Sequence, residues 1–391
     1  MSAGTRPDSR SLAKRAGYEY PGTRIAVTGA TGFIGAHVVR LLAERGAEVR
    51  VTHRDPARLT HLGDIAVTPV EADVLDRAAL RRAFRGARVV FHGAGVVATR
   101  PAENVWKVNA LAPRLAVEAA AAENVERVVV TSSVGGVGPV THGRAGREDD
   151  VYRGGGLGLT YVDSKHEGEA EALAAGARCG IEVVVVNPSY VLGVPVNRSQ
   201  PGETSTRIVG NYLRGRLPAI VDGATNIVHV EDAALGHLLA AERGRPGERY
   251  ILGGQNVGWV QLVERVAELS GIRHPLLVIP PDVAEVIAAA GSLSGGMIIS
   301  PEAFALMAQD WRYSSQKAKK ELGYRPRGLE TTLRETVEWY VELMRSGALG
   351  RGRPSPMSLG SLGVRLAARA GGMRVLHAVE GWTGRRLVAV G

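Results

Sequence analysis

The feature that most constrains the fold is a regular alternation of short β-branched runs with amphipathic runs rich in alanine and leucine, over residues 24–190. Such alternation is typical of a parallel β-sheet with helices on both faces. The expected strands are Arg24–Thr28, Val49–Thr52, Ile65–Val70, Arg88–His92, Arg127–Thr131 and Glu182–Asn187, and the expected helices are Phe33–Arg45, Arg77–Arg85, Val105–Glu123 and Tyr161–Arg178. The chain is therefore predicted to be an α/β protein with a doubly wound parallel sheet.

A glycine pattern follows the first expected strand and directly precedes a helix. Its spacing is G-x-x-G-x-x-G, formed by Gly29, Gly32 and Gly35 with Thr31, Phe33 and Ile34 between them. Glycine lets the backbone of such a turn approach a pyrophosphate, whose charge is bound by amides at the positive helix end. A tight βα turn without a ligand has the same spacing, but the position between strand and helix favours nucleotide binding.

The alternation ends after Asn187-Pro188, where glycine and proline punctuate the chain. A smaller, mostly helical region with some return to the sheet is expected there, with helices at Arg207–Leu213, Ala233–Glu242, Trp259–Leu269 and Leu333–Leu343. After a linker from about residue 346, the composition allows one or two short helices within Leu359–Ala370 and Met373–Val379. We predict an N-terminal extension (1–23), a dinucleotide-binding domain (24–190), a substrate-binding region (191–345) and a basic C-terminal extension (346–391).

Composition excludes several classes of protein. The single cysteine, Cys179, cannot form an intrachain disulfide, and no Cys/His cluster has zinc-ligand spacing, so no metal is expected. No run approaches the roughly 18 apolar residues of a membrane span, and the first twenty residues lack a signal-peptide core. We therefore expect a cytoplasmic protein that is not integral to a membrane.

The net charge of +9 is concentrated at the chain ends. Residues 342–391 contain eight arginines against two glutamates, and residues 1–23 contain four basic groups against two acidic ones. A protein that binds nucleic acid would carry a basic face on its folded body and more aromatic residues than the 5% found here, so nucleic acid is not an expected partner. The C-terminal extension is expected to be dispensable for the dinucleotide fold, and to serve assembly, cover of the active site or attachment to anionic lipid.

Cofactor choice depends on the residue at the end of the second strand. An acidic residue there binds the ribose hydroxyls of NAD, whereas arginine accepts the extra phosphate of NADP. Asp55, followed by Pro56, is a plausible helix N-cap, which leaves Arg54 for that phosphate. NADP(H) is therefore favoured and NAD(H) stays possible, with a solvated surface role as the alternative for Arg54. Asp73 and Val74 follow the third strand, where Asp73 either accepts a hydrogen bond from adenine or simply ends the strand.

Three residues suggest proton transfer. Strand Arg127–Thr131 ends in Ser132-Ser133, and Tyr161 and Lys165 open a later helix. Residues at i and i+4 share one helical face, so the ammonium can approach the phenol. A positive charge stabilises phenolate and lowers a tyrosine pKa that is ordinarily about 10, which would make Tyr161 a usable proton donor or acceptor.

In this chain order the motifs resemble those of the extended short-chain dehydrogenase/reductase superfamily, over residues 24 to about 340. The matching motifs are Thr28–Gly35, Thr131-Ser132-Ser133, Tyr161 with Lys165, Asn187-Pro188-Ser189 with Gly193, and Val228–Asp232. The last two, with Glu248–Gly254 and Glu321–Pro326, are most similar to dihydroflavonol-reductase-like proteins and hopanoid-associated sugar epimerases. The resemblance implies a Rossmann-type fold and an NAD(P)-dependent oxidoreductase.

The resemblance also implies roles for single residues. Ser133, chosen over Ser132 by alignment alone, would form a triad with Tyr161 and Lys165 beside the nicotinamide. Tyr161 would protonate the substrate oxygen, Ser133 would hydrogen-bond to it, and Lys165 would also hold the nicotinamide ribose. Further cofactor contacts are implied at Asn109, Asn187, Pro188 and Ser189, although Asn109 could be an ordinary polar residue on a helix. Dimerisation through helices Val105–Glu123 and Tyr161–Arg178 is expected only from the family.

Positions at which this sequence differs from the family's motifs limit the reactions that we expect. Nucleotide-sugar dehydratases place Asp-Glu where Ser132-Ser133 stand, so elimination is not expected. His229 precedes Glu231-Asp232 and a helix, which favours a structural corner over an acid. The three expected wall segments of the substrate site, Val96–Trp106, Val134–Thr160 and Tyr190–Leu217, are glycine-rich and apolar and form either a mobile lid or a loop.

We therefore favour NADPH-dependent reduction of a ketone of a small cyclic metabolite, of the kind found in secondary metabolism. The first alternative is a nucleotide-sugar epimerase, for which Arg207, Arg214 and Arg216 are candidate diphosphate ligands. The second is a non-catalytic NADP sensor, against which the Tyr161 and Lys165 pair argues.

Overall fold

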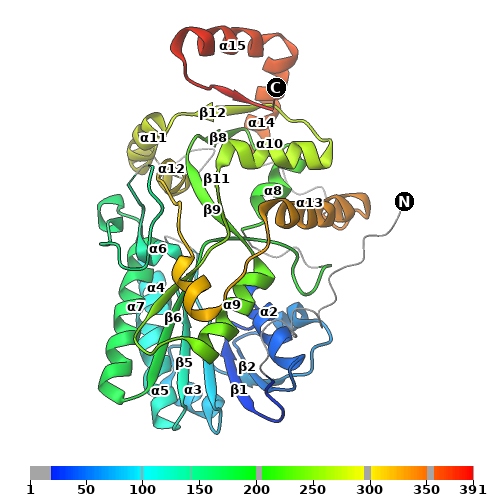
Figure 1. The fold of residues 1–391 in the computed structure, drawn as a ribbon. Helices are drawn as coiled ribbons and strands as arrows, with labels where there is room; N and C mark the ends of the chain where they lie inside the picture. Colours follow the sequence, from blue (N-terminus) through cyan, green and yellow to red (C-terminus); the bar gives the residue numbers. More distant parts are fainter. Residues whose placement is uncertain are drawn as a thin grey trace.

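A seven-stranded parallel sheet organises the first part of the chain (Figure 1). The computed structural model describes residues 19–97, 100–141, 143–199, 205–294, 301–349 and 356–390. The strand order is β10-β6-β5-β4-β1-β2-β3, and every neighbouring pair is parallel. The strands are β1 Arg24–Thr28, β2 Glu48–His53, β3 Thr68–Glu71, β4 Val89–His92, β5 Arg127–Thr131, β6 Glu182–Pro188 and β10 Arg249–Leu252. The predicted Rossmann-type α/β fold is confirmed, with its order reversing between β1 and β4, where such sheets bind ligands.

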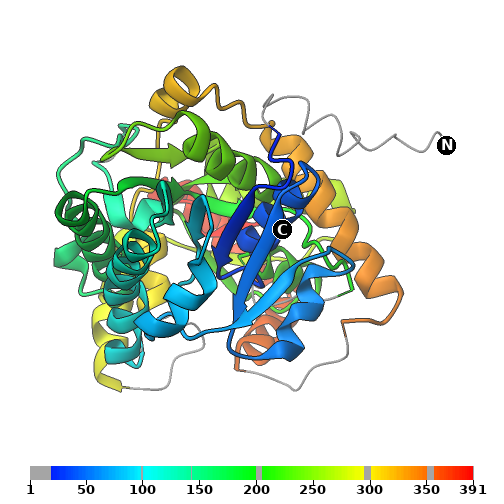
Figure 2. The same cartoon turned by 90° about the horizontal axis from the view of Figure 1, so that it is seen from below.

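Helices cover both faces of this sheet (Figure 2). One face carries α2 (Phe33–Ala43) and α9 (Val230–Arg243), and the other carries α3 (Arg77–Phe84), α5 (Ala112–Ala122) and α7 (Thr160–Cys179). Side chains alternate along each strand, so Val129 packs with α2 and α9 whereas Val128 and Val130 pack with α3 and α5. Strands β1, β4, β5 and β6 are thus buried on both sides, whereas the edge strand β3 is largely exposed.

Two expected elements differ in detail. The third strand begins at Thr68, and Ile65 and Val67 pack against the core without pairing in the sheet. The single helix expected at Val105–Glu123 is three segments: α4 (Ala102–Trp106), a π-helical turn η2 (Lys107–Leu111) and α5.

Pro113 explains the π-helical turn. Proline has no backbone N–H, so Pro113 cannot donate to the carbonyl of Asn109 one turn earlier, and the ladder widens there. Helix α7 approaches this turn closely, because a Cβ atom at Gly168 would lie only 2.1 Å from the Asn109 carbonyl oxygen. The π-helical turn at Pro113 therefore fixes the position of Asn109, one of the predicted site residues.

The region after β6 contains more strand than expected. One small sheet contains β7 (Tyr190–Leu192), β9 (Ala224–His229) and β11 (Gln255–Gly258), and a second contains β8 (Ala219–Val221), β12 (Leu276–Ile279) and β13 (Val388–Ala389). Helices α8 (Arg207–Leu213), α10 (Trp259–Ser270) and α13 (Leu329–Arg345) form a separate core with these strands. The expectation of a mostly helical region missed these strands because each has only two to six residues.

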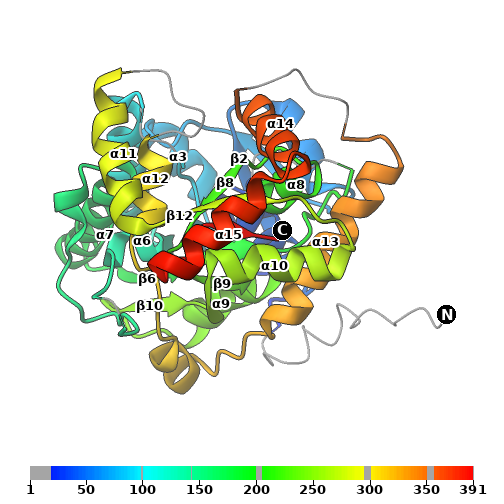
Figure 3. The same ribbon diagram turned by 90° about the horizontal axis from the view of Figure 1, so that it is seen from above.

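Helices α11 (Pro281–Ser294), α12 (Pro301–Ala308), α14 (Pro356–Arg369) and α15 (Gly372–Thr383) complete this end of the molecule. Seen from above, α14 and α15 lie outermost (Figure 3). The chain then returns through β13, which pairs antiparallel with β12. Among the described residues, no helix is long and apolar enough to cross a membrane.

Candidate active site

The turn between β1 and α2 excludes side chains at its glycines. Gly29 has a φ of +67°, and a Cβ atom there would lie 2.4 Å from the carbonyl of Gly93, in the loop after β4. A Cβ atom at Gly35 would lie 2.2 Å from the Gly29 carbonyl oxygen, so α2 packs directly on the turn. These two positions require glycine.

Helix α2 begins without a side-chain cap. Gly32 is its N-cap residue, and Phe33, Ile34 and Gly35 form the first turn, whose amides have no intrahelical partner. Such amides, at the positive end of the helix dipole, bind phosphate. The adjoining Thr31 carbonyl oxygen lies 3.1 Å from His61 Nδ1. The turn fits the pyrophosphate of a dinucleotide because it combines close backbone approach with uncapped amides.

Arg54 and Asp55 directly follow β2, and their side chains have different roles. Asp55 accepts a hydrogen bond from the backbone N–H of Ala57 at 2.9 Å and caps the 3₁₀-helix η1 (Pro56–Leu62), as predicted. Arg54 stays exposed, with its Nη1 atom 3.9 Å from Asp73 Oδ2. The guanidinium is therefore accessible to a ligand phosphate.

Asp73 lies beside Arg54 at the carboxyl end of β3. Its Oδ1 atom accepts a hydrogen bond from Leu75 N at 2.9 Å, while the neighbouring Val74 is buried against α3. Asp76 caps α3 by accepting from two backbone amides, as the sequence indicates. Asp73 thus both shapes this turn and presents a carboxylate near Arg54.

Ser133 and Tyr161 meet at the turn that follows β5. Ser133 is the N-cap of α6 (Val134–Val137), and its Oγ atom accepts a hydrogen bond from Gly135 N at 3.1 Å. A Cβ atom at Gly135 would lie 3.5 Å from both Ser133 Oγ and Tyr161 Cε1. Burial raises the pKa of Tyr161, and a hydrogen bond with Ser133 opposes that rise.

Lys165 lies one helical turn after Tyr161 and is 8% exposed. Burial lowers the pKa of Lys165 to about 8, and attraction to Glu169 opposes that fall. Its Nζ atom donates to the Thr131 carbonyl at 3.4 Å. The lowering of the Tyr161 pKa expected from Lys165 is not found, because burial of the phenol dominates here.

Asn109 ties the loop after β4 to helix α7. Its Oδ1 atom accepts from Val96 N at 2.9 Å, and its Nδ2 atom donates to the Val96 carbonyl and to Ser164 Oγ. A Cβ atom at Gly95 would lie 2.9 Å from Lys165 Nζ and 3.3 Å from Asn109 Oδ1, so this loop contacts both side chains. Asn109 orders the loop next to Lys165, and its contact with a cofactor stays a prediction.

The sequence reasoning missed Glu169, which is buried one turn beyond Lys165. Its Oε1 atom accepts from Ser132 Oγ and from Asn187 Nδ2, both at 2.5 Å, and its Oε2 atom lies 3.1 Å from Arg249 Nη1. The one available signal was spacing, since Glu169 continues the i, i+4 series of Tyr161 and Lys165 along α7.

The end of β6 contributes Asn187, Pro188 and Ser189. The Asn187 amide donates to Glu169 and, at 2.9 Å, to the Ser133 carbonyl, so it supports the β5 end. Its Oδ1 atom and Ser189 Oγ are buried and have no hydrogen-bond partner among the described residues. Buried polar atoms in this state are suited to a ligand, which agrees with the predicted cofactor contacts.

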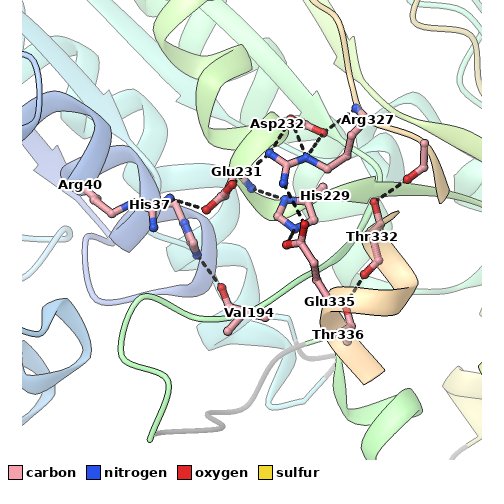
Figure 4. A network of polar contacts seen from close by, with 11 residues as sticks. His37, Arg40, Val194, His229, Glu231, Asp232, Arg327, Thr332, Glu335 and Thr336 are labelled. Atoms are coloured by element: carbon pink, nitrogen blue, oxygen red, sulfur yellow. Dashed lines mark hydrogen bonds and ion pairs between the residues drawn. The ribbon is translucent and has the colours of Figure 1, made fainter. Parts of the chain in front are cut away.

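His229 forms the predicted corner rather than an acid (Figure 4). It caps α9, with its Nδ1 atom accepting from Glu231 N and its Nε2 atom 3.1 Å from Glu335. Arg327 binds the Asp232 carboxylate through Nε and Nη2 and also contacts Glu231 and Glu335. Both ring nitrogens of His229 are engaged, Nδ1 in capping α9 and Nε2 in holding α9 to α13.

The same network reaches α2, which packs on the seven-stranded sheet. Arg40 on α2 binds Glu231 at 2.7 Å, and His37 Nε2 lies 2.9 Å from the Val194 carbonyl (Figure 4). Burial opposes ionisation of Glu231, but Arg40 and Arg327 hold its pKa down at about 2. The described residues contain no group of three His, Cys, Asp or Glu side chains that could hold a metal.

The described part of the Val134–Thr160 segment is anchored. The Tyr313 hydroxyl donates to the Gly138 carbonyl at 2.6 Å, and Tyr152 donates to Asp163 at 2.5 Å while stacking on His166. Tyr161 packs against an apolar cluster whose members include Val134, Val137, Leu159, Val162, Trp311 and Tyr313. The proton-donor candidate therefore lies in largely apolar surroundings.

The model of the NAD dependent epimerase/dehydratase family matches residues 25–253. The chain is 32% identical over 330 residues to a putative dihydroflavonol 4-reductase of Synechocystis sp., covering 80% of this chain and 93% of that protein. It is 30% identical over 329 residues to sterol demethylase protein B of Methylococcus capsulatus, covering 81% and 98%. A nucleoside-diphosphate-sugar epimerase structure from Pseudomonas aeruginosa superposes with a TM-score of 0.69 at 27% identity, covering 83% and 99%.

Proposed function

Because the chain belongs to the NAD dependent epimerase/dehydratase family, within the extended short-chain dehydrogenases/reductases, we propose that it is an NADP(H)-dependent reductase of a bulky cyclic ketone. The observation that carries the proposal is the Ser133 and Tyr161 pair next to buried Lys165, at the carboxyl ends of β4 and β5. Side chains at these strand ends face the ligand in folds of this type.

The proposed residues divide the reaction into separate tasks. When bound, the dinucleotide supplies a hydride to the carbonyl carbon. Tyr161 donates its phenolic proton to the substrate oxygen, so the carbonyl becomes an alcohol and the tyrosine becomes a phenolate. Ser133 hydrogen-bonds to the same oxygen, and the positive charge of Lys165 stabilises the phenolate before it takes a proton from water.

Several groups would hold the dinucleotide. The uncapped amides of Phe33, Ile34 and Gly35 would bind the pyrophosphate, and Lys165 would hold the nicotinamide ribose. Arg54 would bind the extra phosphate of NADP, which is supported by its exposure and by the diversion of Asp55 to the cap of η1. Asp73, Val74, Asn109 and Asn187-Pro188-Ser189 complete the proposed contacts.

The substrate class follows from the surroundings of Tyr161. An apolar wall is better suited to a ring system than to a charged nucleotide. Two relatives are named for a dihydroflavonol and a sterol, both of which are polycyclic. A reductase also uses exchangeable NADPH, whereas an epimerase must retain its cofactor through oxidation and re-reduction.

The alternative is a nucleotide-sugar epimerase, favoured by the similarity to the Pseudomonas structure. Stoichiometry separates the two reactions. With a panel of polycyclic ketones and NADPH, we expect one NADPH oxidised per alcohol formed. Interconversion of a nucleotide sugar at constant NADPH absorbance would overturn the proposal and establish the alternative.

A pair of tyrosine variants tests the assignment of the proton donor. Tyr161→Phe should lower turnover by about 10²–10⁴-fold, the usual contribution of a positioned acid, while leaving NADPH affinity nearly unchanged. Tyr20→Phe is the matched control, because it removes a buried hydroxyl that binds Glu242, far along the chain from the triad. Normal turnover by Tyr161→Phe would refute the assignment.

A further inference from the structure

The C-terminal hairpin, defined here as α14 and α15, is firmly attached to the substrate region. Ser361 donates to the Gly215 carbonyl at 2.7 Å, and Arg385 forms an ion pair with Asp282. Glu380 accepts hydrogen bonds from the backbone of Leu387 and Val388, which leads into β13. The hairpin therefore has a defined inner and outer face.

Helix α14 directs its leucines toward solvent, whereas an ordinary surface helix packs its apolar face on the core. Its polar Ser361 is 1% exposed and faces the protein, whereas Leu359, Leu362 and Leu366 are 45–60% exposed. These leucines recur at i, i+3 and i+7 and so share one outward stripe. A helix whose apolar stripe faces away from its own core is built to contact something else.

Helix α15 continues the outward apolar surface. Val375, Val379 and Trp382 also recur at i, i+4 and i+7, and Trp382 is 89% exposed. Val283 and Val286 on α11 are exposed at the same end of the molecule (Figure 3). Eight of the eleven exposed large hydrophobic residues among the described residues thus lie on α11, α14 and α15, at one end of the molecule (Figure 1).

The charged residues of the C-terminal hairpin indicate what kind of partner it binds. Arg369 and Arg374 are exposed on either side of the bend between the two helices. Glu380 is the single acidic residue of positions 356–390, and its carboxylate is engaged by His377 and the backbone near β13. The outward surface of the C-terminal hairpin therefore combines leucine, valine and tryptophan with positive charge, whereas the neighbouring α11 also exposes Asp282 and Glu285.

We propose that the C-terminal hairpin docks the enzyme on an anionic lipid bilayer, with its apolar stripe lying in the interface. Helices with an apolar stripe, arginine and tryptophan bind bilayers in this way, and anionic headgroups attract the arginines. A second copy of the chain is the competing occupant of this surface, and the oligomeric state in solution distinguishes it from a bilayer. The proposal does not depend on which ketone is reduced.

Vesicle sedimentation of the full chain tests this proposal. We expect binding to phosphatidylcholine vesicles that contain phosphatidylglycerol, weaker binding to phosphatidylcholine alone, and a fall in binding as salt is raised. The triple variant Leu359→Ser, Leu362→Ser, Leu366→Ser should reduce partitioning by at least about a hundredfold, given the area each leucine buries. Val151→Ser is the matched control, since it changes an exposed valine outside the hairpin.

Two further measurements separate the role of charge from that of apolar contact. Arg369→Gln with Arg374→Gln leaves the apolar stripe intact and should remove the preference for anionic vesicles; NADPH binding by every variant checks that it folds. The fluorescence of Trp382 should shift to shorter wavelength on anionic vesicles, and Trp382→Phe should remove that shift. Equal vesicle binding by the triple variant would overturn the proposal, as would a dimer in solution that the triple variant converts to monomer.

Discussion

The buried carboxylate of Glu169 forms an ion pair with the partly exposed Arg249, with 3.1 Å between Oε2 and Nη1. Its other oxygen accepts hydrogen bonds from Ser132 and Asn187, and Asn187 also binds the carbonyl of Ser133. Three strand ends, those of β5, β6 and β10, therefore meet at one side chain of α7. Through Asn187, Glu169 is linked to the backbone of Ser133, the proposed catalytic serine.

Replacing Glu169 by glutamine should loosen this arrangement. The variant leaves the Arg249 charge without its partner, and the cost in free energy of unfolding is about 1–3 kcal/mol, less than for a fully buried pair because Arg249 is partly exposed. Turnover should fall with little change in NADPH affinity. Urea denaturation and steady-state kinetics measure both effects, with Glu171→Gln, a partly exposed position on the same helix, as the control. Wild-type stability and turnover for Glu169→Gln would contradict the positioning role.

The pH profile of the reaction should report Lys165. Its pKa of about 8 means that the ammonium loses its proton as the pH rises through that value, and the phenolate of Tyr161 then loses its stabilising charge. We expect kcat/KM for reduction to fall above pH 8, because this ratio follows the free enzyme. Glu169 raises the Lys165 pKa, so Glu169→Gln should move the fall to lower pH. A profile that is flat from pH 7 to 10 would be inconsistent with this role.

Stability should change with pH in the opposite direction. The Lys165 pKa is about 8 in the folded protein and 10.5 ordinarily, so between these values the unfolded chain binds a proton that the folded chain has released. The contribution of this group to the free energy of unfolding therefore rises with pH from about 8 to 10.5. Lys165→Met removes the titrating group. Because the unmodified protein gains stability from this group as the pH rises, the free energy of unfolding of the variant minus that of the unmodified protein should be smaller, or opposite in sign, at pH 10 than at pH 7.5.

Features that depend on neighbouring residues were predictable from the sequence. The glycine turn and the Asp55 and Asp76 caps each lie within one turn of the chain, where spacing alone fixes geometry. The Glu169 network was not predictable, because its hydrogen-bond and ion-pair partners come from other strands and lie up to 80 positions from Glu169 in the chain. A buried carboxylate has no local signature until those strands are assembled.

The short strands that follow β6 were missed for the same reason. Strand β13 has two residues and exists because it pairs with β12, more than 100 positions earlier in the chain. Short strands of this kind derive their stability from a partner rather than from local propensity. Helices α8, α9, α10 and α13 were predicted because their apolar periodicity is local, whereas α11 and α12 were not predicted. The division into domains and the dimer contact through α5 and α7 stay predictions.

Cofactor preference should depend on Arg54. Arg54→Ala removes the proposed partner of the extra phosphate, and a charged hydrogen bond of about 1.5–3 kcal/mol corresponds to a roughly ten- to hundredfold loss of NADPH affinity. NADH affinity should stay unchanged. Arg58→Ala, at an exposed position on η1, is the control. Equal dissociation constants of the unmodified protein for NADPH and NADH would refute the proposed preference.

Deletion of residues 347–391 should separate cofactor binding from stability. The hydrogen bonds and ion pairs of the described tail join it to the substrate region, at Gly215, Glu264 and Asp282. We therefore expect the truncated chain to bind NADPH with the affinity of the full chain, measured by fluorescence titration.

The same deletion removes the last buried strand. Val388, Ala389 and Val390 are less than 10% exposed, and Ala389 and Val390 belong to the core formed by α10 and β12, so their loss should lower the free energy of unfolding by about 2–5 kcal/mol. Val388→Ser with Ala389→Ser in the full chain should reproduce part of that loss, while leaving the C-terminal hairpin in place. If the truncated chain instead loses NADPH binding while still folded, the tail contributes to the dinucleotide domain and the proposed division of the chain is wrong.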